Sequence, residues 1–125
     1  MAKALVVDDS KAVRMILAKT LKELGFEVRE AANGREALEV IEVEKTAVTL
    51  VLADWNMPEM NGLDFIRALR SQPIYNGVRI VMVTTETECE QVTRALNAGA
   101  DEFIMKPFTK DILVAKLNLL ELIEE

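Results

Sequence analysis

Five short runs of apolar residues, rich in Val, Ile and Leu, alternate along this chain with longer segments whose apolar residues recur at helical spacing. Apolar runs of this length are typical of strands that are buried on both faces of a parallel sheet. We predict strands over residues 3–7, 27–31, 49–53, 79–83 and 102–105. Short connections and right-handed crossovers then favour an α/β protein with a doubly wound five-stranded parallel sheet and helices on both faces.

The second predicted strand differs from the other four, because polar and apolar residues alternate within it. This alternation is expected of an edge strand with one solvent-exposed side. Residues that start or stop helices mark the segments between the strands. We predict five helices: four begin at Ser10, Asn33, near Gly62 and at Thr109, and the one that is fourth in chain order begins at a capping box of Thr85 or Thr87.

The length and composition of the chain limit its function. Its 125 residues predict one domain over residues 1–125, with no output domain. The net charge of −6 argues against nucleic acid as a direct partner, and no apolar run approaches the roughly 18 residues of a membrane span. A single cysteine, Cys89, and a start without a secretory pattern predict a cytoplasmic protein. The absence of histidine excludes Ser-His-Asp and Cys-His catalysis and histidine metal sites.

Four of the predicted strands end at groups that suit phosphate chemistry. These groups are Asp8 and Asp9, Asp54, Thr84, and Lys106. Each has an ordinary explanation when taken alone, such as helix capping or a solvated side chain in a loop. Because parallel strands end along one edge of the sheet, where ligands bind, we expect all of these groups to meet in one pocket.

The three carboxylates in the predicted pocket indicate a cation site. Carboxylates a few ångströms apart repel one another unless a cation lies between them. Since the chain offers oxygen ligands and no histidine, the fitting ion is Mg²⁺, with Mn²⁺ as a possible substitute. We interpret Asp54 as a nucleophile that forms an aspartyl phosphate, beside a metal-binding pair of Asp8 and Asp9. Thr84 then supplies a hydroxyl donor to the phosphoryl group, and Lys106 supplies a positive charge.

Four motifs resemble those of receiver domains in two-component response regulators, specifically the single-domain chemotaxis type called CheY. They are VVDDS at 6–10, LADWNMPEMNG at 52–62, VMVTT at 81–85 and NAGADEFIMKPF at 97–108. Together these motifs are highly specific, and the resemblance covers essentially all of the chain. It implies a flavodoxin-like sheet with strand order 2-1-3-4-5 and a cis peptide bond before Pro107.

The resemblance also implies a role for each residue of the pocket. Asp54 would accept a phosphoryl group from a histidine kinase or a histidine phosphotransfer domain. The implied Mg²⁺ ligands are Asp9, Asp54 and the backbone carbonyl of Asn56, with Asp8 acting through a water molecule. Thr84 and Lys106 would contact the phosphoryl group.

A conformational switch is a further implication of the resemblance. Thr84 would move toward the phosphate and Phe103 would turn inward, which reshapes the face of the fourth helix, fifth strand and fifth helix for a downstream protein. Core packing would explain Phe103 equally well. Asn56 and Glu86 flank the expected pocket mouth and resemble the type with a short-lived phosphate. Thr85 stands where the family often has a smaller residue, so it bears on phosphate access and on the switch.

Other functions fit parts of the sequence. A haloacid-dehalogenase-type phosphatase needs a second aspartate where this chain has Asn56, so we expect no enzyme activity beyond the chain's own phosphorylation and autodephosphorylation. A flavodoxin-like electron carrier shares the topology, but no Gly/Ser/Thr-rich phosphate loop follows the first predicted strand. A stand-alone phosphorelay intermediate and a receiver-like adaptor that acts without phosphorylation both stay open as alternatives.

The predicted fifth helix carries two apolar stripes that together cover more than half of its circumference. The first stripe consists of Leu113, Leu117 and Leu120, and the second consists of Ile112, Ala115, Leu119, Leu122 and Ile123. Deep burial of a terminal helix explains both stripes. A surface for a partner or a second copy explains them equally well, so we expect a monomer or a weak dimer.

Overall fold

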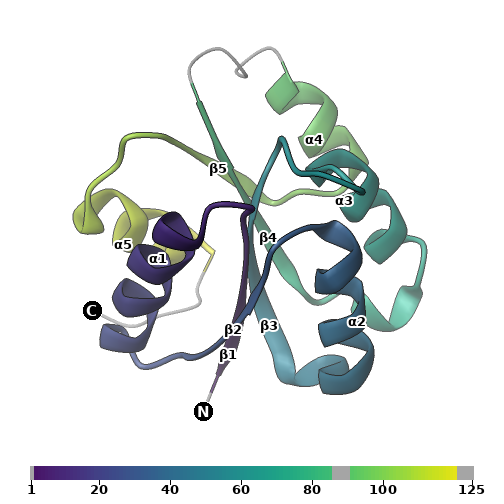
Figure 1. Ribbon diagram of the computed structural model, residues 1–125, viewed down its shortest axis with the longest axis horizontal. Coiled ribbons are helices and arrows are strands. Elements are labelled where there is room, and N and C mark those ends of the chain that lie inside the picture. The colour runs from purple at the N-terminus through teal and green to yellow at the C-terminus, as the bar shows by residue number, and fades with distance from the viewer. Residues whose placement is uncertain (1, 86–90, 121–125) are drawn as a thin grey trace.

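The computed structural model describes residues 2–85 and 91–120, in which strands and helices alternate (Figure 1). In chain order the main elements are β1 (Lys3–Val7), α1 (Lys11–Glu23), β2 (Glu27–Ala31), α2 (Gly34–Glu44), β3 (Val48–Asp54), α3 (Gly62–Arg70), β4 (Arg79–Thr84), α4 (Val92–Ala98), β5 (Glu102–Met105) and α5 (Lys110–Leu119). Two short 3₁₀ helices, η1 (Lys45–Ala47) and η2 (Pro73–Tyr75), precede β3 and β4. The predicted strands are confirmed, except that β3 is one residue longer at each end, from Val48 to Asp54, and β4 ends one residue later, at Thr84.

The five strands form one parallel sheet in the order β2-β1-β3-β4-β5, as predicted. The alternating strand β2 lies at an edge, and all but the last of its residues are exposed or partly exposed. The central strand β3 is buried along nearly its whole length, with Thr49 alone partly exposed. A strand covered on both faces needs apolar side chains on both, and this explains its continuous apolar sequence.

The sheet lies between two layers of helices. α1 and α5 cover one face, and α2, α3 and α4 cover the other (Figure 1). Phe65 and Leu69 of α3 pack into the core on the second face, whereas Leu113 and Leu117 of α5 pack into the core on the first. Each of these four side chains is fully buried. Burial of their apolar surface on both faces fixes the strand edge at which the candidate site residues lie.

Polar side chains cap the starts of four helices. Ser10 accepts a hydrogen bond from the Val13 N–H at 3.3 Å, and Thr109 accepts one from the Ile112 N–H at 3.3 Å. Equivalent bonds begin α2 at Asn33 and α3 at Asn61. The described part of α4 begins only at Val92, after Gln91, which makes no side-chain cap. Of the two predicted caps for this helix, Thr85 lies directly after β4 and Thr87 lies outside the described residues.

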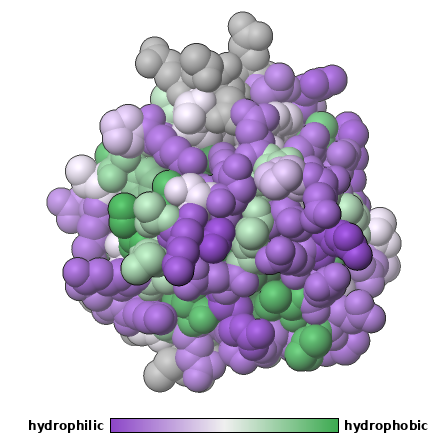
Figure 2. Space-filling view, in the orientation of Figure 1, coloured by the Kyte–Doolittle hydropathy of each residue, from purple (hydrophilic) through white to green (hydrophobic). Residues whose placement is uncertain are grey.

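The two apolar stripes of α5 have different surroundings. Leu113 and Leu117 are buried, whereas the second-stripe residues Ile112 and Leu119 are 46% and 70% exposed. Apolar side chains reach the surface on the left flank of the molecule, where α1 and α5 lie (Figure 2). Leu122 and Ile123 lie outside the described residues. In the part of the chain that the structure describes, every helix is too short or too polar to cross a membrane.

Candidate functional site

The predicted site residues lie at one edge of the sheet, at the carboxyl ends of four strands. Asp8 follows β1, Asp54 ends β3, Thr84 ends β4, and Lys106 follows β5. The strand register places Asp54 opposite Val83 and Thr84 opposite Met105, so neighbouring strands end at nearly the same height. Parallel pairing therefore gathers residues from distant parts of the sequence, as expected of a ligand site in a doubly wound fold.

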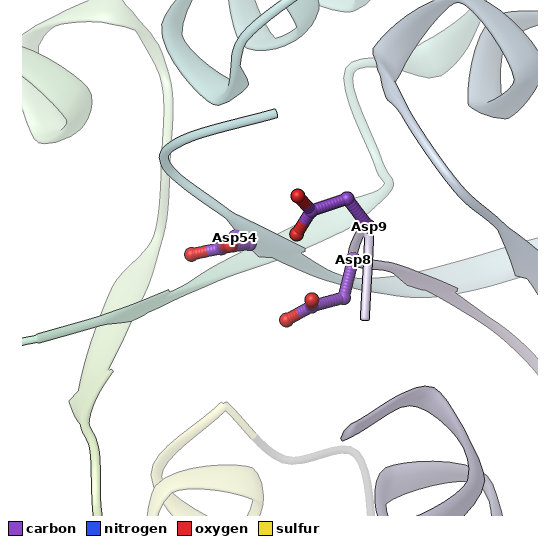
Figure 3. A group of neighbouring side chains, drawn as sticks. All are labelled: Asp8, Asp9 and Asp54. Carbon is purple, nitrogen blue, oxygen red and sulfur yellow. The ribbon is translucent and has the colours of Figure 1, made fainter. Parts of the chain in front are cut away.

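Three carboxylates form the centre of the site. Asp8 and Asp9 follow β1, and Asp54 extends from the end of β3 into the same region (Figure 3). One oxygen of each carboxylate lies within 4.8 Å of an oxygen of each of the others. Asp8 and Asp54 are buried, whereas Asp9 is exposed. The cluster thus combines two desolvated carboxylates with one that faces solvent.

Backbone hydrogen bonds orient the two buried carboxylates. Asp8 Oδ1 accepts from the Ser10 N–H at 2.9 Å, and Asp54 Oδ1 accepts from the Trp55 N–H at 2.8 Å. These bonds stabilise the charged carboxylate in a setting that has little water. Each buried carboxylate is therefore held by a backbone N–H from the one or two residues that follow it in the chain.

Lys106 brings a positive charge to the buried carboxylates. Its Nζ lies 3.3 Å from Asp8 Oδ2 and 3.7 Å from Asp54 Oδ1, and its side chain is 25% exposed. The peptide bond between Lys106 and Pro107 is cis, as the resemblance implied. An ammonium group between two carboxylates offsets part of their repulsion and leaves a charge for an incoming anion.

Thr84 contributes a buried hydroxyl at the end of β4. The residue is 1% exposed, and its Oγ1 has no hydrogen-bond partner among the described residues. Its backbone carbonyl accepts from the Lys106 N–H at 2.6 Å, which joins β4 to the segment that follows β5. A buried hydroxyl without a partner costs about 1–3 kcal/mol, so this atom is suited to a ligand that completes its hydrogen bonding.

The donor set fits a hard divalent cation. Three carboxylates supply oxygen ligands, and the chain has no histidine to compete with them. Mg²⁺ prefers such ligands, commonly binds through one or two carboxylates, and retains several waters. The exposed carboxylate of Asp9 leaves room for those waters. The residues present at this edge therefore agree with the expected ion.

The other predicted residues lie around this cluster. Asn56 is exposed in the loop after β3, and Thr85 is partly buried directly after Thr84. Phe103 lies on β5 opposite Met82, where it is partly buried and packs against the core beneath α2, α3 and α4. Glu86 lies outside the described residues. Phe103 is therefore placed next to the core rather than among the carboxylates.

Lys116 contacts both residues at the start of β5. Its Nζ lies 5.1 Å from the centroid of the Phe103 ring and 3.2 Å from Glu102 Oε1. An ammonium at this distance from an aromatic ring makes a cation–π contact. Lys116 thus connects α5 to the aromatic side chain at the predicted switch position.

Sequence reasoning missed a structural contact of Arg14. Its Nη1 donates to the backbone carbonyl of Asp8 at 2.7 Å, and its Nε lies 3.3 Å from Glu30 Oε1. The guanidinium therefore holds the turn between β1 and α1 that carries the acidic pair. A lone arginine on an amphipathic helix gives no signal for this contact, since the pattern of a solvated helix face explains it equally well.

An apolar groove adjoins the lysine side of the site. It has a volume of about 290 Å³ and is lined by Val13, Ile16, Leu17, Lys106, Pro107 and Phe108. A wider depression of about 580 Å³ lies along α1 near Lys22 and Glu30, and none of the candidate site residues line it. The candidate site residues therefore lie outside the wider depression.

Comparisons with known proteins agree with this geometry. A model of the response regulator receiver domain family matches residues 4–118. Chemotaxis protein CheY1 of Helicobacter pylori strain 26695 is 45% identical over 118 residues, which are 94% of each chain. A chemotaxis protein CheY homolog of Campylobacter jejuni strain 81-176 is 44% identical over 117 residues, 93% of this chain and 89% of the relative.

Solved structures show the same likeness. Chemotaxis protein CheY4 of Vibrio cholerae, crystallised at low pH, superimposes with a TM-score of 0.87 at 39% identity, covering 95% of this chain and 98% of that one. A putative response regulator from Chloroflexus aurantiacus has a TM-score of 0.88 at 30% identity, covering 96% and 98% of the two chains. This chain therefore belongs to the response regulator receiver domain family, and chemotaxis proteins of the CheY type are among its relatives.

Proposed function

We propose that this chain is a phosphorylation-activated switch of a two-component system, in which Asp54 accepts a phosphoryl group in a Mg²⁺-dependent reaction. The observation that carries the proposal is the cluster of Asp8, Asp9 and Asp54 beside Lys106. The names of the relatives point to chemotaxis as the process in which the switch acts. The phosphoryl donor is then a histidine kinase or a histidine phosphotransfer domain.

Each residue has a defined part in the proposed reaction. A carboxylate oxygen of Asp54 bonds to phosphorus as the bond from phosphorus to the donor's imidazole nitrogen breaks, and the imidazole leaves with the bonding pair. Lys106 stabilises the charge on the phosphoryl oxygens, and the Thr84 hydroxyl donates a hydrogen bond to one of them. When bound by Asp9, Asp54 and the carbonyl of Asn56, with Asp8 acting through water, Mg²⁺ supplies further positive charge for the same oxygens.

The lifetime of the aspartyl phosphate depends on the attack of water. The site has no histidine, and the position two residues after Asp54 is an amide, Asn56, which cannot act as a general base. We therefore propose that the chain catalyses only its own phosphorylation and autodephosphorylation. This property suits a signal that persists for a limited time and then decays.

The proposed output is the surface formed by α4, β5 and α5. Three exposed apolar side chains lie on its three elements: Leu96 on α4, Met105 on β5 and Leu119 on α5. Exposed apolar residues on adjacent elements favour a protein partner. Movement of Thr84 toward the phosphoryl group and of Phe103 toward the core would change this surface.

Incubation with acetyl phosphate tests the proposed function. With Mg²⁺, wild type should gain the mass of one phosphoryl group, and it should gain none in EDTA. Asp54→Asn should gain none under either condition. Asp64→Asn is a matched control, because Asp64 is exposed in the first turn of α3, and it should react as wild type does. No gain by wild type would refute the proposal and favour an adaptor that acts without phosphorylation. Transfer onward to a histidine phosphotransfer domain would indicate a phosphorelay intermediate.

A further inference from the structure

The loop between β3 and α3, residues 55–61, is joined to the start of α2. The Gly34 N–H donates to the Met60 carbonyl at 3.2 Å, and Asn33 Nδ2 donates to Glu59 Oε2 at 3.0 Å. A Cβ on Gly34 would lie only 2.9 Å from Met60 Cγ and from the Met60 carbonyl oxygen. The first residues of α2 and the tip of the loop are therefore packed against each other.

Glu59 has a backbone conformation that needs such support. Its φ is +65°, in the left-handed region that residues other than glycine seldom adopt. The Met60 N–H donates to the Pro58 carbonyl at 2.7 Å and closes a three-residue turn centred on Glu59. Residues in this region persist when the surrounding structure holds them there.

Asn33 supplies that support with both ends of its amide. Its Oδ1 accepts from the Glu36 N–H at 2.8 Å and caps α2, while its Nδ2 holds Glu59. Asn33 is 5% exposed, so the donor end of the bond to Glu59 is shielded from water. Arg35 adds a second contact, with its Nη1 3.8 Å from Glu59 Oε1, but both of these side chains are more than half exposed. The buried amide is therefore the stronger of the two contacts.

The base of the same loop is fixed at the acidic cluster. The Gly62 N–H donates to the Trp55 carbonyl at 2.9 Å. A Cβ on Gly62 would lie 2.5 Å from the Asp54 carbonyl oxygen and 2.8 Å from Met82 Cε, so any larger residue would push the loop away from β3. Residues 56–58 therefore connect two fixed parts of the loop, its start at Trp55 and its tip at Glu59.

Asn56 lies in this short connection, three residues before Glu59. Pro58 lies between them, and its ring fixes its φ, which limits the conformations that this connection can adopt. We propose that Asn33 and Glu59 are positioning residues for the cation site. Their hydrogen bond holds Asn56 in place and thereby sets the affinity of the site for Mg²⁺. This inference rests on the proposed function, in which the Asn56 carbonyl is a ligand to the ion.

Two variants with the net charge of wild type isolate the hydrogen bond. Asn33→Ser keeps a side chain that can cap α2 but removes the amide that donates to Glu59. The double variant Asn33→Asp with Glu59→Gln reverses donor and acceptor and so restores the bond. Asn76→Ser is the matched control, because Asn76 is exposed at the opposite edge of the sheet, three residues before β4.

Isothermal titration with Mg²⁺ is the measurement, with urea unfolding in EDTA as a separate readout of stability. Asn33→Ser should raise the Kd for Mg²⁺ about tenfold, the usual effect of losing a group that orients a metal ligand. The double variant and Asn76→Ser should stay within about twofold of wild type. The inference is overturned if Asn33→Ser binds Mg²⁺ as wild type does, even with lowered stability, or if the double variant binds as weakly as Asn33→Ser. If wild type itself binds no Mg²⁺, the proposed function fails as well.

Discussion

The ammonium of Lys106 lies 3.3 Å from a carboxylate oxygen of Asp8, although the two residues are 98 positions apart in the chain. The contact crosses the carboxyl edge of the sheet from the end of β5 to the end of β1. It places a fixed positive charge beside buried carboxylates, where screening by water is weak. The loss of this charge should affect cation binding and phosphoryl transfer in opposite directions.

We expect Lys106→Met to bind Mg²⁺ at least as tightly as wild type, because the carboxylates lose a competing positive charge. Phosphorylation by acetyl phosphate should slow by about a hundredfold, because the transferred group loses a preorganised cation. Titration calorimetry and mass spectrometry over time measure the two effects. Lys110→Met is the control, since Lys110 is exposed and its Nζ lies 3.9 Å from Glu23 Oε1, away from the site. Equal phosphorylation rates for Lys106→Met and this control would contradict the role of Lys106 in phosphoryl transfer.

Arg70 of α3 should contribute strongly to the stability of the fold, through contacts with the segments that precede β4 and β5. Its guanidinium donates to the carbonyls of Gly99 and Val78 at 3.0 and 2.6 Å and to Asp101 Oδ2 at 3.0 Å. We expect Arg70→Met to lower the free energy of unfolding by about 2–4 kcal/mol, because partly buried acceptors lose their donor.

Urea unfolding measures this loss. Arg67→Met, on an exposed position of the same helix, should change stability by no more than about 0.5 kcal/mol. Arg70→Lys should fail to restore wild-type stability, since an ammonium group cannot reproduce the planar set of donors. Equal effects of the Arg70 and Arg67 variants would show that the guanidinium contacts contribute nothing.

Glu44 predicts a pH-dependent contribution to stability. The hydrogen bond from Lys3 at 2.6 Å, aided by the charges of Lys3 and Arg29, lowers the pKa of Glu44 despite the opposing effect of burial. A carboxyl whose pKa is lower in the folded state stabilises the fold above its unfolded pKa, and that stabilisation is lost as the pH falls through the folded value.

We therefore expect Glu44→Gln to be less stable than wild type at pH 7, and we expect this difference in stability to shrink as the pH falls through the lowered pKa of Glu44. Urea unfolding at a series of pH values below 7 tests this, followed by fluorescence of the single tryptophan, Trp55. Glu42→Gln, an exposed neighbour on α2, is the control. A difference between Glu44→Gln and wild type that stays the same throughout the acidic range would contradict the ion-pair explanation.

The two stripes of α5 should respond differently to truncation. Leu117 is fully buried, so Leu117→Ala should cost about 2–5 kcal/mol of unfolding free energy. Leu119 is 70% exposed, so Leu119→Ala should cost no more than about 0.5 kcal/mol. Urea unfolding measures both values. Sedimentation of Leu119→Glu beside wild type then shows whether the exposed stripe joins two copies of the chain, because a buried charge would separate them.

Sequence patterns predicted the sheet because burial on two faces leaves a simple signal. The limits of β1, β2 and β5 agree with the predicted ranges. β3 and β4 end one residue later than predicted because Asp54 and Thr84 stay in the ladder, opposite Val83 and Met105, and β3 also starts one residue earlier, where Val48 pairs with Lys3. A polar residue after an apolar run predicts the start of a loop, although backbone pairing does not depend on side-chain polarity.

The sequence predicts those parts of the candidate site whose residues lie at the carboxyl ends of strands. Parallel pairing brings Asp8, Asp54 and Lys106 together whatever the details of the loops. The contact of Arg14 with the Asp8 carbonyl and that of Asn33 with Glu59 were not predicted. Both depend on how separate segments pack after folding, and neither residue type nor local spacing records that information.

In the proposed switch, the Thr84 hydroxyl, which has no hydrogen-bond partner among the described residues, would affect the balance between the resting and activated forms. A polar atom buried without a partner makes the resting form less stable than its packing alone would allow, by about 1–3 kcal/mol. A ligand that accepts its hydrogen bond recovers that energy in one conformation only. A difference of this size changes the ratio of two conformations about 5- to 150-fold. In the proposed switch, the hydroxyl that makes no hydrogen bond in one form would thus contribute part of the free energy by which a bound phosphoryl group selects the other form.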